Sequence, residues 1–227
     1  MLRVEDKYIL PAVSMAAAEQ KLRSLLPPDS VGGKDGYTVS SLYFDDIRDS
    51  MLTDSENGNP FRDKYRIRIY DHSLNVIKLE VKRKSYNRAV KFSSRITEEE
   101  LRRLMAGETI PNANDLSDAR TLFDLAILRR GLRPRVEVCY ERNAYVCEQG
   151  NVRITFDRNI RASDRWELFG QAGIVYDRVP GEASVLEVKY DACIPRYITQ
   201  VLECGKMVQT ANSKYALCRE LYQGKRE

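Results

Sequence analysis

Two stretches of the chain alternate polar and apolar residues one by one, which is the pattern of β-strands that bury one face. They cover residues 64–70 and 76–84, and residues 71–75 between them predict a hairpin loop. Stretches rich in β-branched and aromatic residues predict further strands at 4–9, 37–45, 88–95, 133–142, 151–157 and 184–190, with short ones near 144–147 and 173–176. The pattern favours a mainly antiparallel sheet, and about eight strands are enough to close a barrel.

Capping signals and helical spacing predict five helices around these strands. Ser14 is placed to cap the first, and Thr97 with Glu100 forms a capping box for the second. The helices are expected at 14–26, from 98 onward, at 117–130, at 195–206 and at 214–223, whereas 54–62 has the composition of a loop. No linker or repeat interrupts the chain. We therefore predict one α+β domain over residues 1–227, a mainly antiparallel closed β-barrel with helices that flank and cap it.

The composition excludes several classes of protein. Of 227 residues, 43% are hydrophobic, which is enough for a sizeable core and too many for a disordered chain. The five cysteines form no CxxC pair and their number is odd, which favours a reducing compartment. The longest uncharged stretch near the N-terminus, residues 8–18, is shorter than the roughly 20 residues of a membrane span. We expect a cytoplasmic protein with no membrane span of its own.

Positive charge is concentrated in one part of the chain. Residues 64–91 hold nine basic and two acidic residues, +7 net, although the whole chain carries only +4. Side chains two apart in a strand share a face, so Arg66 and Arg68 lie together, as do Lys82 and Lys84. Such a face is either the solvated side of an open sheet or the wall of a site that holds several negative charges at once.

Glutamates stand among basic residues near the middle of four predicted strands. They are Glu5, Glu80, Glu137 and Glu187. Carboxylate oxygens are ligands that Mg²⁺ or Mn²⁺ takes, and a bound polyphosphate usually brings such a cation. The four glutamates are therefore candidate metal ligands, with simple ion pairing to their basic neighbours as the alternative.

Eight short motifs occur in order along almost the whole chain. They are residues 3–8 (RVEDKY), 41–45 (SLYFD), 64–70 (KYRIRIY), 79–84 (LEVKRK), 140–145 (YERNAY), 152–157 (VRITFD), 185–190 (VLEVKY) and 213–215 (SKY). Together they resemble the VTC domain, the polyphosphate polymerase branch of the triphosphate tunnel metalloenzymes. The hydrolase and cyclase branches begin with Glu-x-Glu-x-Lys, whereas this chain has Arg3 in place of the first glutamate, before Glu5 and Lys7. That difference favours the VTC branch over a thiamine triphosphatase or a class IV adenylate cyclase.

The resemblance implies a β-tunnel lined by the charged strand faces, and it assigns roles to individual residues. Those implied to hold ATP, triphosphate or polyphosphate are Lys7, Arg66, Arg68, Lys82, Lys91, Tyr140, Arg142, Arg153, Lys189, Ser213 and Lys214. Those implied to carry catalysis are Arg66, Arg68, Lys82, Arg142, Arg153 and Glu187, with Glu187 as the ligand of Mn²⁺ or Mg²⁺. Ser213 and Lys214 also begin a predicted helix, whose N-terminal amides favour anions.

The implied reaction moves the terminal phosphoryl group of ATP onto a growing polyphosphate chain. Phosphoryl transfer depends on charge neutralisation and placement, and the incoming phosphate oxygen is already ionised, so we assign no general base. The alternatives are an inorganic or nucleoside triphosphatase of the same fold, and a non-catalytic polyphosphate or inositol-phosphate binder.

Two other classes fit the sequence less well. His72, the only histidine, lies in a predicted hairpin loop, which disfavours Ser/His/Asp catalysis. Tyr65 falls on the strand face opposite Arg66, and an RNA-binding sheet needs aromatic and basic residues on one face, so we expect no nucleic-acid partner. A membrane-protein partner is expected by family analogy only.

Overall fold

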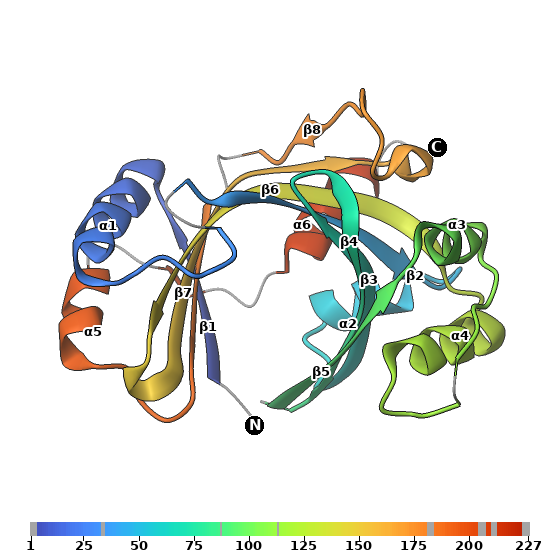
Figure 1. Cartoon of the computed structure of the whole chain (residues 1–227), viewed down its shortest axis with the longest axis horizontal. Helices are drawn as coiled ribbons and strands as arrows, with labels where there is room; N and C mark the ends of the chain where they lie inside the picture. The colour runs from blue at the N-terminus through green and yellow to red at the C-terminus, as the bar shows by residue number, and fades with distance from the viewer. Residues whose placement is uncertain are drawn as a thin grey trace. The chain divides into compact units, whose positions relative to one another are not determined.

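The computed structural model describes residues 4–32, 35–86, 88–112, 114–180, 184–203, 208–209 and 213–223 (Figure 1). The chain divides into two compact units. Unit 1 combines Met1–Thr38, Tyr140–Ile160 and Arg178–Ala211, and unit 2 combines Val39–Cys139, Arg161–Asp177 and Asn212–Glu227. Arg3 of the first sequence motif lies outside the described residues.

The fold is α+β, with ten strands and six helices in the described part of the chain. The strands are β1 (Val4–Leu10), β2 (Tyr37–Asp45), β3 (Phe61–Tyr70), β4 (Ser73–Ser85), β5 (Arg88–Ile96), β6 (Arg133–Cys147), β7 (Val152–Ser163), β8 (Asp177–Arg178), β9 (Ser184–Tyr190) and β10 (Val208–Gln209). The helices are α1 (Ala12–Leu25), α2 (Ser50–Glu56), α3 (Glu98–Ala106), α4 (Ala119–Arg130), α5 (Arg196–Leu202) and α6 (Lys214–Gln223).

The strands form one antiparallel sheet in the order β10-β1-β9-β7-β6-β2-β3-β4-β5, with β8 beside β7. Among the described residues no pairing joins β10 to β5, so the closed barrel stays a prediction. The predicted strands at 37–45 and 184–190 are confirmed to the residue. The predicted hairpin loop is shorter than expected, because Asp71 and His72 alone make the turn, both with positive φ, as a two-residue hairpin turn requires.

In unit 1, α1 and α5 cover one face of β1, β9 and β7 (Figure 1). Met15, Ala18 and Leu22 of α1 pack on apolar residues of these strands, among them Phe156 and Leu186. Since side chains alternate along a strand, Glu5 and Lys7 of β1 and Glu187 of β9 point to the opposite face, whereas Arg158 of β7 pairs with α1. Burial of one face by helices therefore leaves the other face to the charged side chains.

Unit 2 follows the same plan. Helices α3 and α4 cover β3, β4 and β5 on one side (Figure 1), and Phe123 of α4 lies edge-on to Phe44 and Tyr65. The capping box predicted at Thr97 and Glu100 is confirmed, and Gly131 ends α4 in the left-handed conformation. Ile67, Leu79 and the other apolar strand residues are buried under these helices. Basic residues that alternate with them, among them Arg66, Arg68 and Lys82, lie on the uncovered face.

Several predicted boundaries differ from the structure. Strand β3 begins at Phe61, inside the predicted loop at 54–62, and α5 ends at Leu202, before the predicted end at 206. Helix α1 begins at Ala12, two residues before Ser14, after Pro11, whose fixed φ suits the start of a helix. Residues 144–147 continue β6 instead of forming a separate strand, and 173–176 form none.

Helix α2 was not expected, because its start lacks an ordinary cap. Asp49 precedes it in the left-handed conformation and makes no side-chain cap. Instead, the carboxylates of Asp45 and Asp46 accept hydrogen bonds from the backbone amides of Ser50, Met51 and Leu52. These acceptors lie four to seven residues before the amides that they bind. A capping rule that considers only the residue next to the helix therefore does not predict them.

Helix α6 is anchored to the end of β2. The Tyr215 ring stacks on Tyr43 with centroids 5.1 Å apart, and its hydroxyl donates to Asp45 Oδ2 at 2.7 Å. Arg219, one turn later, donates to both oxygens of Asp49 at 2.9 and 2.8 Å. These contacts fix the position of Lys214 at the start of the helix.

Tyr215→Phe should lower the free energy of unfolding by about 1–3 kcal/mol, because it leaves the buried Asp45 carboxylate without one donor. Urea denaturation monitored by circular dichroism measures the change. The exposed Tyr197→Phe is the matched control and should change the free energy by less than about 0.5 kcal/mol. Equal stability of the Tyr215 variant and the wild type would show that this hydrogen bond does not hold α6.

Candidate functional site

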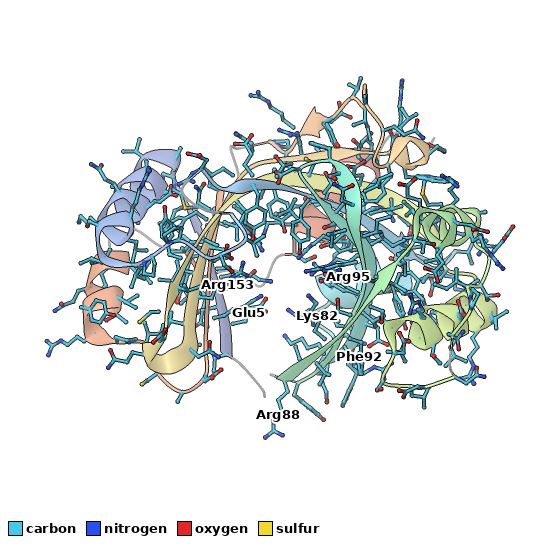
Figure 2. The ribbon with its side chains drawn as sticks, in the orientation of Figure 1. Glu5, Lys82, Arg88, Phe92, Arg95 and Arg153 are labelled. Atoms are coloured by element: carbon cyan, nitrogen blue, oxygen red, sulfur yellow. The ribbon has the colours of Figure 1, made fainter. Side chains whose placement is uncertain are left out.

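The uncovered face of unit 2 carries rows of charged side chains that run across its strands. Residues directly opposite one another form three rows: Tyr43, Arg66, Glu80 and Ser93; Ser41, Arg68, Lys78 and Arg95; and Lys64, Lys82 and Lys91. Figure 2 shows Lys82 and Arg95 on this face, whereas Phe92 packs toward the helices. We call this surface the cationic face.

Glu80 lies at the centre of the cationic face and is 1% exposed. Arg66 Nε and Nη2 both lie 2.7 Å from Glu80 Oε2, Arg68 Nη1 lies 3.7 Å from the same oxygen, and Lys91 pairs with Oε1. Burial raises the pKa of Glu80, but the attraction of these three cations outweighs burial and holds that pKa well below its usual range. Glu80 is thus one carboxylate in contact with three cations.

The two arginines are also fixed by neutral partners. Arg66 Nη1 donates to the Tyr43 hydroxyl at 3.1 Å, and Arg68 Nε donates to Ser41 Oγ at 3.1 Å. Burial raises the pKa of Tyr43, but Arg66, Arg68 and Lys214 together lower it below its ordinary value. The influence of Lys214 shows that the first residue of α6 lies near this face. The guanidinium groups are therefore oriented before any anion arrives.

Ser213 has a local role in the structure. Its Oγ accepts a hydrogen bond from the amide of Ala216 at 3.1 Å, which caps the start of α6. The predicted pair Ser213 and Lys214 is thus brought to the cationic face by the helix that Tyr215 anchors.

Unit 1 brings four predicted residues into one ring of alternating charge, on the face opposite α1 and α5. In the register of β1 with β9, Glu5 lies opposite Lys189 and Lys7 opposite Glu187. Lys7 Nζ is 2.9 Å from Glu5 and 3.9 Å from Glu187, and Lys189 Nζ is 2.7 Å from Glu187 and 3.6 Å from Glu5. Each ammonium group therefore lies between the same two carboxylates, and the four charges balance.

Thr155 of β7 lies opposite Glu187 and is buried. Its Oγ1 has no hydrogen-bond partner among the described residues. A buried hydroxyl without a partner is costly in a folded protein, so a group supplied by a ligand would satisfy it. The ring of Glu5, Lys7, Glu187 and Lys189 is therefore a candidate ligand site.

The predicted arginines of unit 1 are held by acidic partners. Arg142 Nε and Nη2 donate to the two oxygens of Asp157 at 2.6 and 2.7 Å, and its guanidinium lies 5.2 Å from the centre of the Tyr140 ring. Arg142 is buried, which lowers its pKa, but Asp157 more than compensates, and the pKa stays well above the usual value. Arg153 donates to Asp29 at 2.5 Å and to the Tyr37 hydroxyl at 3.1 Å. Figure 2 shows Arg153 and Glu5 on this side of unit 1.

Glu137 is not brought to the cationic face. Its Oε1 accepts from the Tyr176 hydroxyl at 2.7 Å, and its carboxylate also bonds to Ser40. Ser40 and Ser41 are consecutive in β2, so they point to opposite faces, and Arg68 bonds to Ser41. Glu137 therefore lies on the face away from Arg68. The prediction failed because the alternation of side chains shows which residues of a strand share a face, but not which face of the sheet it is.

Sequence reasoning missed Tyr43, Ser41, Lys78 and Arg95 as residues of the cationic face. The spacing of Arg95 from Lys91 could have found one of them, since they lie four apart in one strand. Tyr43 and Ser41 can be assigned to the cationic face only from the register of β2 with β3, which cannot be read from the local sequence.

The VTC domain matches residues 2–222, nearly the whole chain. This chain belongs to the VTC domain family. The resemblance stated from the sequence motifs is therefore confirmed. Among curated proteins, none matches the chain. In the part of the chain that the structure describes, no helix is long and apolar enough to cross a membrane.

Solved structures support the fold of this VTC domain. A candidate adenylate cyclase from Bacillus halodurans is similar with a TM-score of 0.56 and 14% identity, over 93% of this chain and 94% of that one. A protein from Pyrococcus horikoshii OT3 has a TM-score of 0.49 and 18% identity, over 99% of both chains. The first of these similarities shows a shared fold and, at this identity, nothing about a shared reaction.

Lys91 gives the VTC domain a pH-dependent charge. Burial lowers the pKa of Lys91 to about 8, an effect that nearby Arg66 and Arg68 increase and that Glu80 opposes. Below this pKa the ammonium is charged, and above it the charge is lost. Affinity for tripolyphosphate should therefore fall roughly three- to tenfold between pH 7 and pH 9.

Isothermal titration calorimetry across this pH range measures the effect. The Lys91→Arg variant keeps its positive charge throughout this pH range. Any change in its affinity therefore measures the titration of tripolyphosphate itself and serves as the control. A pH profile of Lys91→Arg that matches the wild type would show that Lys91 does not titrate in this range.

Proposed function

We propose that this VTC domain is a metal-dependent polyphosphate polymerase, which transfers the terminal phosphoryl group of ATP onto a growing chain of inorganic polyphosphate. The observation that supports it most is the group of three cations around Glu80, in a chain that belongs to the VTC domain family. A face on which several cations are held in fixed positions favours a ligand with several negative charges, and polyphosphate is such a ligand.

In this proposal, Arg66 and Arg68 hold phosphate oxygens on the cationic face. Their guanidinium groups are already oriented by Tyr43, Ser41 and Glu80, so little conformational freedom is lost when a phosphate binds. Lys82, Lys91 and Lys214 act as point charges along the same chain of phosphates. Lowering the electrostatic energy of the transferring group is the main requirement of phosphoryl transfer, and these residues meet it without a covalent intermediate.

Arg142 and Arg153 have a different role in the proposal. Because Asp157 binds Arg142 through both oxygens, the pair contributes no net charge. We assign Arg142 to holding Tyr140 and the strand face in place. Arg153, which is less buried, stays a candidate for phosphate contact beside Lys7 and Lys189.

The carboxylates of Glu5 and Glu187 fit a divalent cation. Two ammonium groups already bridge them, so cationic charge is favoured between their oxygens, and the hydroxyl of Thr155 lacks a partner nearby. Mn²⁺ or Mg²⁺ is bound through one or two carboxylates when substrate phosphates supply further ligands. When bound, the metal would neutralise charge on the phosphate oxygens. Two other glutamates do not fit this role, because Glu80 is engaged by three cations and Glu137 lies on the other face. Among the described residues, no cluster of three or more His, Cys, Asp or Glu side chains could hold a metal ion.

A phosphate-binding tunnel is part of the proposal, as the family implies. We also propose that the enzyme acts in the cytoplasm, where ATP is supplied, and that a membrane-protein partner takes the product. The same cationic face would serve a triphosphatase or a polyphosphate binder, so the product decides the function.

Incubation with ATP and Mn²⁺, followed by gel electrophoresis with a polyphosphate stain, should show long chains. Free phosphate alone would indicate a triphosphatase, and neither product would indicate a binder. Either result would refute the polymerase.

Glu187→Gln should abolish the metal-dependent turnover, while its circular dichroism spectrum stays that of the folded protein. If Glu187→Gln kept wild-type activity with Mn²⁺, the metal would not be bound there.

Arg66→Ala should weaken tripolyphosphate binding roughly tenfold or more, because it removes a charged donor from the cationic face. Lys82→Ala, on the same face of unit 2, gives the second side of a double-mutant cycle measured by calorimetry. If both residues hold one polyanion, the two losses should be non-additive. An unchanged affinity of Arg66→Ala would remove this residue from the site, and strictly additive losses would argue against one ligand held by both residues.

A further inference from the structure

The end of the β4–β5 hairpin, together with the start of β3, carries exposed apolar side chains. Phe61 is 55% exposed and Tyr86, in the hairpin turn, is 65% exposed, and their rings lie edge-on with centroids 4.9 Å apart. Val90 on β5 is 49% exposed. The part of these strands that α3 and α4 bury begins only at Tyr65 and Val81, so the tip extends beyond the helices. We call Phe61, Tyr86 and Val90 the aromatic tip.

Tyr86 occupies an unfavourable backbone conformation. Its φ of 52° lies in the left-handed region, where a bulky side chain is rare and a glycine or asparagine fits better. Its amide donates to the Pro60 carbonyl at 2.9 Å, which holds the turn against the start of β3. A tyrosine at this position lowers the stability of the hairpin, and such sites of local strain are often functional.

Basic residues lie on both faces of the hairpin end that carries the aromatic tip. Within residues 61–64 and 83–90 there are five basic residues, Arg62, Lys64, Arg83, Lys84 and Arg88, and one acidic residue, Asp63. In the strand register, Arg83 and Arg88 share the face of Phe61, and the other three share the cationic face. Asp63 is engaged by Arg83 through two hydrogen bonds of 3.0 Å. Figure 2 shows Arg88 at the end of the hairpin, pointing away from the strands. The end of the hairpin therefore carries a net positive charge.

We propose that the aromatic tip docks on the surface of a membrane that contains anionic lipids. Aromatic rings favour the depth of the lipid headgroups, and lysines and arginines next to them attract anionic headgroups. A second copy of this chain would bring the same positive charge and be repelled. A free polyanion would use the cations but leave the exposed rings without a role. This inference does not depend on the polymerase reaction.

The test places a single fluorophore at the tip. Tyr86→Trp in a Trp166→Phe background leaves one tryptophan, and its emission is recorded with vesicles of equal parts phosphatidylcholine and phosphatidylglycerol. A blue shift and quenching by brominated lipid are expected with these vesicles, and neither with pure phosphatidylcholine. High salt should reverse the binding. No shift with the anionic vesicles would overturn the proposal.

Vesicle flotation of full-length variants separates the tip from the rest of the surface. Phe61→Ser with Tyr86→Gly should abolish flotation, although Tyr86→Gly alone should raise the melting temperature by removing the strain, so loss of folding cannot explain the result. Arg88→Gln should weaken partitioning roughly fivefold. Leu128→Ser and Arg129→Gln on the exposed side of α4 are matched controls and should float like the wild type.

Three results would contradict docking through the tip. Flotation of the double tip variant at the wild-type level would refute it directly. Dependence on Arg66 and Lys82 in place of the tip would assign lipid binding to the cationic face. Self-association of the protein that the tip variants abolish, measured by analytical ultracentrifugation without vesicles, would identify a second copy as the occupant.

Discussion

The charge balance around one buried carboxylate determines what unit 2 can bind. Glu80 holds Arg66, Arg68 and Lys91 together on a sheet face where they would otherwise repel each other. The carboxylate is essential to this arrangement, because three cations without it would leave a buried surface of unscreened charge. Under the proposed function, the fixed guanidinium groups also select a ligand with oxygens at matching positions.

Both units have one face covered by helices, but the charged residues on the uncovered faces differ in their balance of charge. In both, helices bury one face of the strands and charged residues gather on the other. In unit 1 the charges of Glu5, Lys7, Glu187 and Lys189 cancel, so this face suits a mobile cation and its phosphate ligands more than a bare polyanion. Under the proposed function, the cationic face of unit 2 holds phosphates, and the ring of Glu5, Lys7, Glu187 and Lys189 in unit 1 accepts the metal.

Much of the fold could be predicted because alternation and capping are local. The strands at 37–45 and 184–190 and the capping box at Thr97 follow from residues within a few positions of each other. Interactions across strands could not be predicted in this way. The pairing of Arg142 with Asp157 depends on neighbouring strands, and the orientation of the buried Glu137 away from the cationic face depends on contacts with Ser40 and Tyr176. Sequence patterns therefore grouped the charged residues by strand, but did not identify the acidic partners that hold them.

The anchor of α6 has a consequence for biosynthesis. Tyr215 reaches Asp45 across 170 residues of chain, so this contact forms only after the chain up to Tyr215 has left the ribosome. Until then Lys214 cannot take its place at the edge of the cationic face, and Tyr43 lacks its stacking partner. Contacts of such long separation form late in folding because the closure entropy must be overcome first. A nascent chain that already contains every strand of unit 2 would thus carry an incomplete cationic face until α6 has been synthesised.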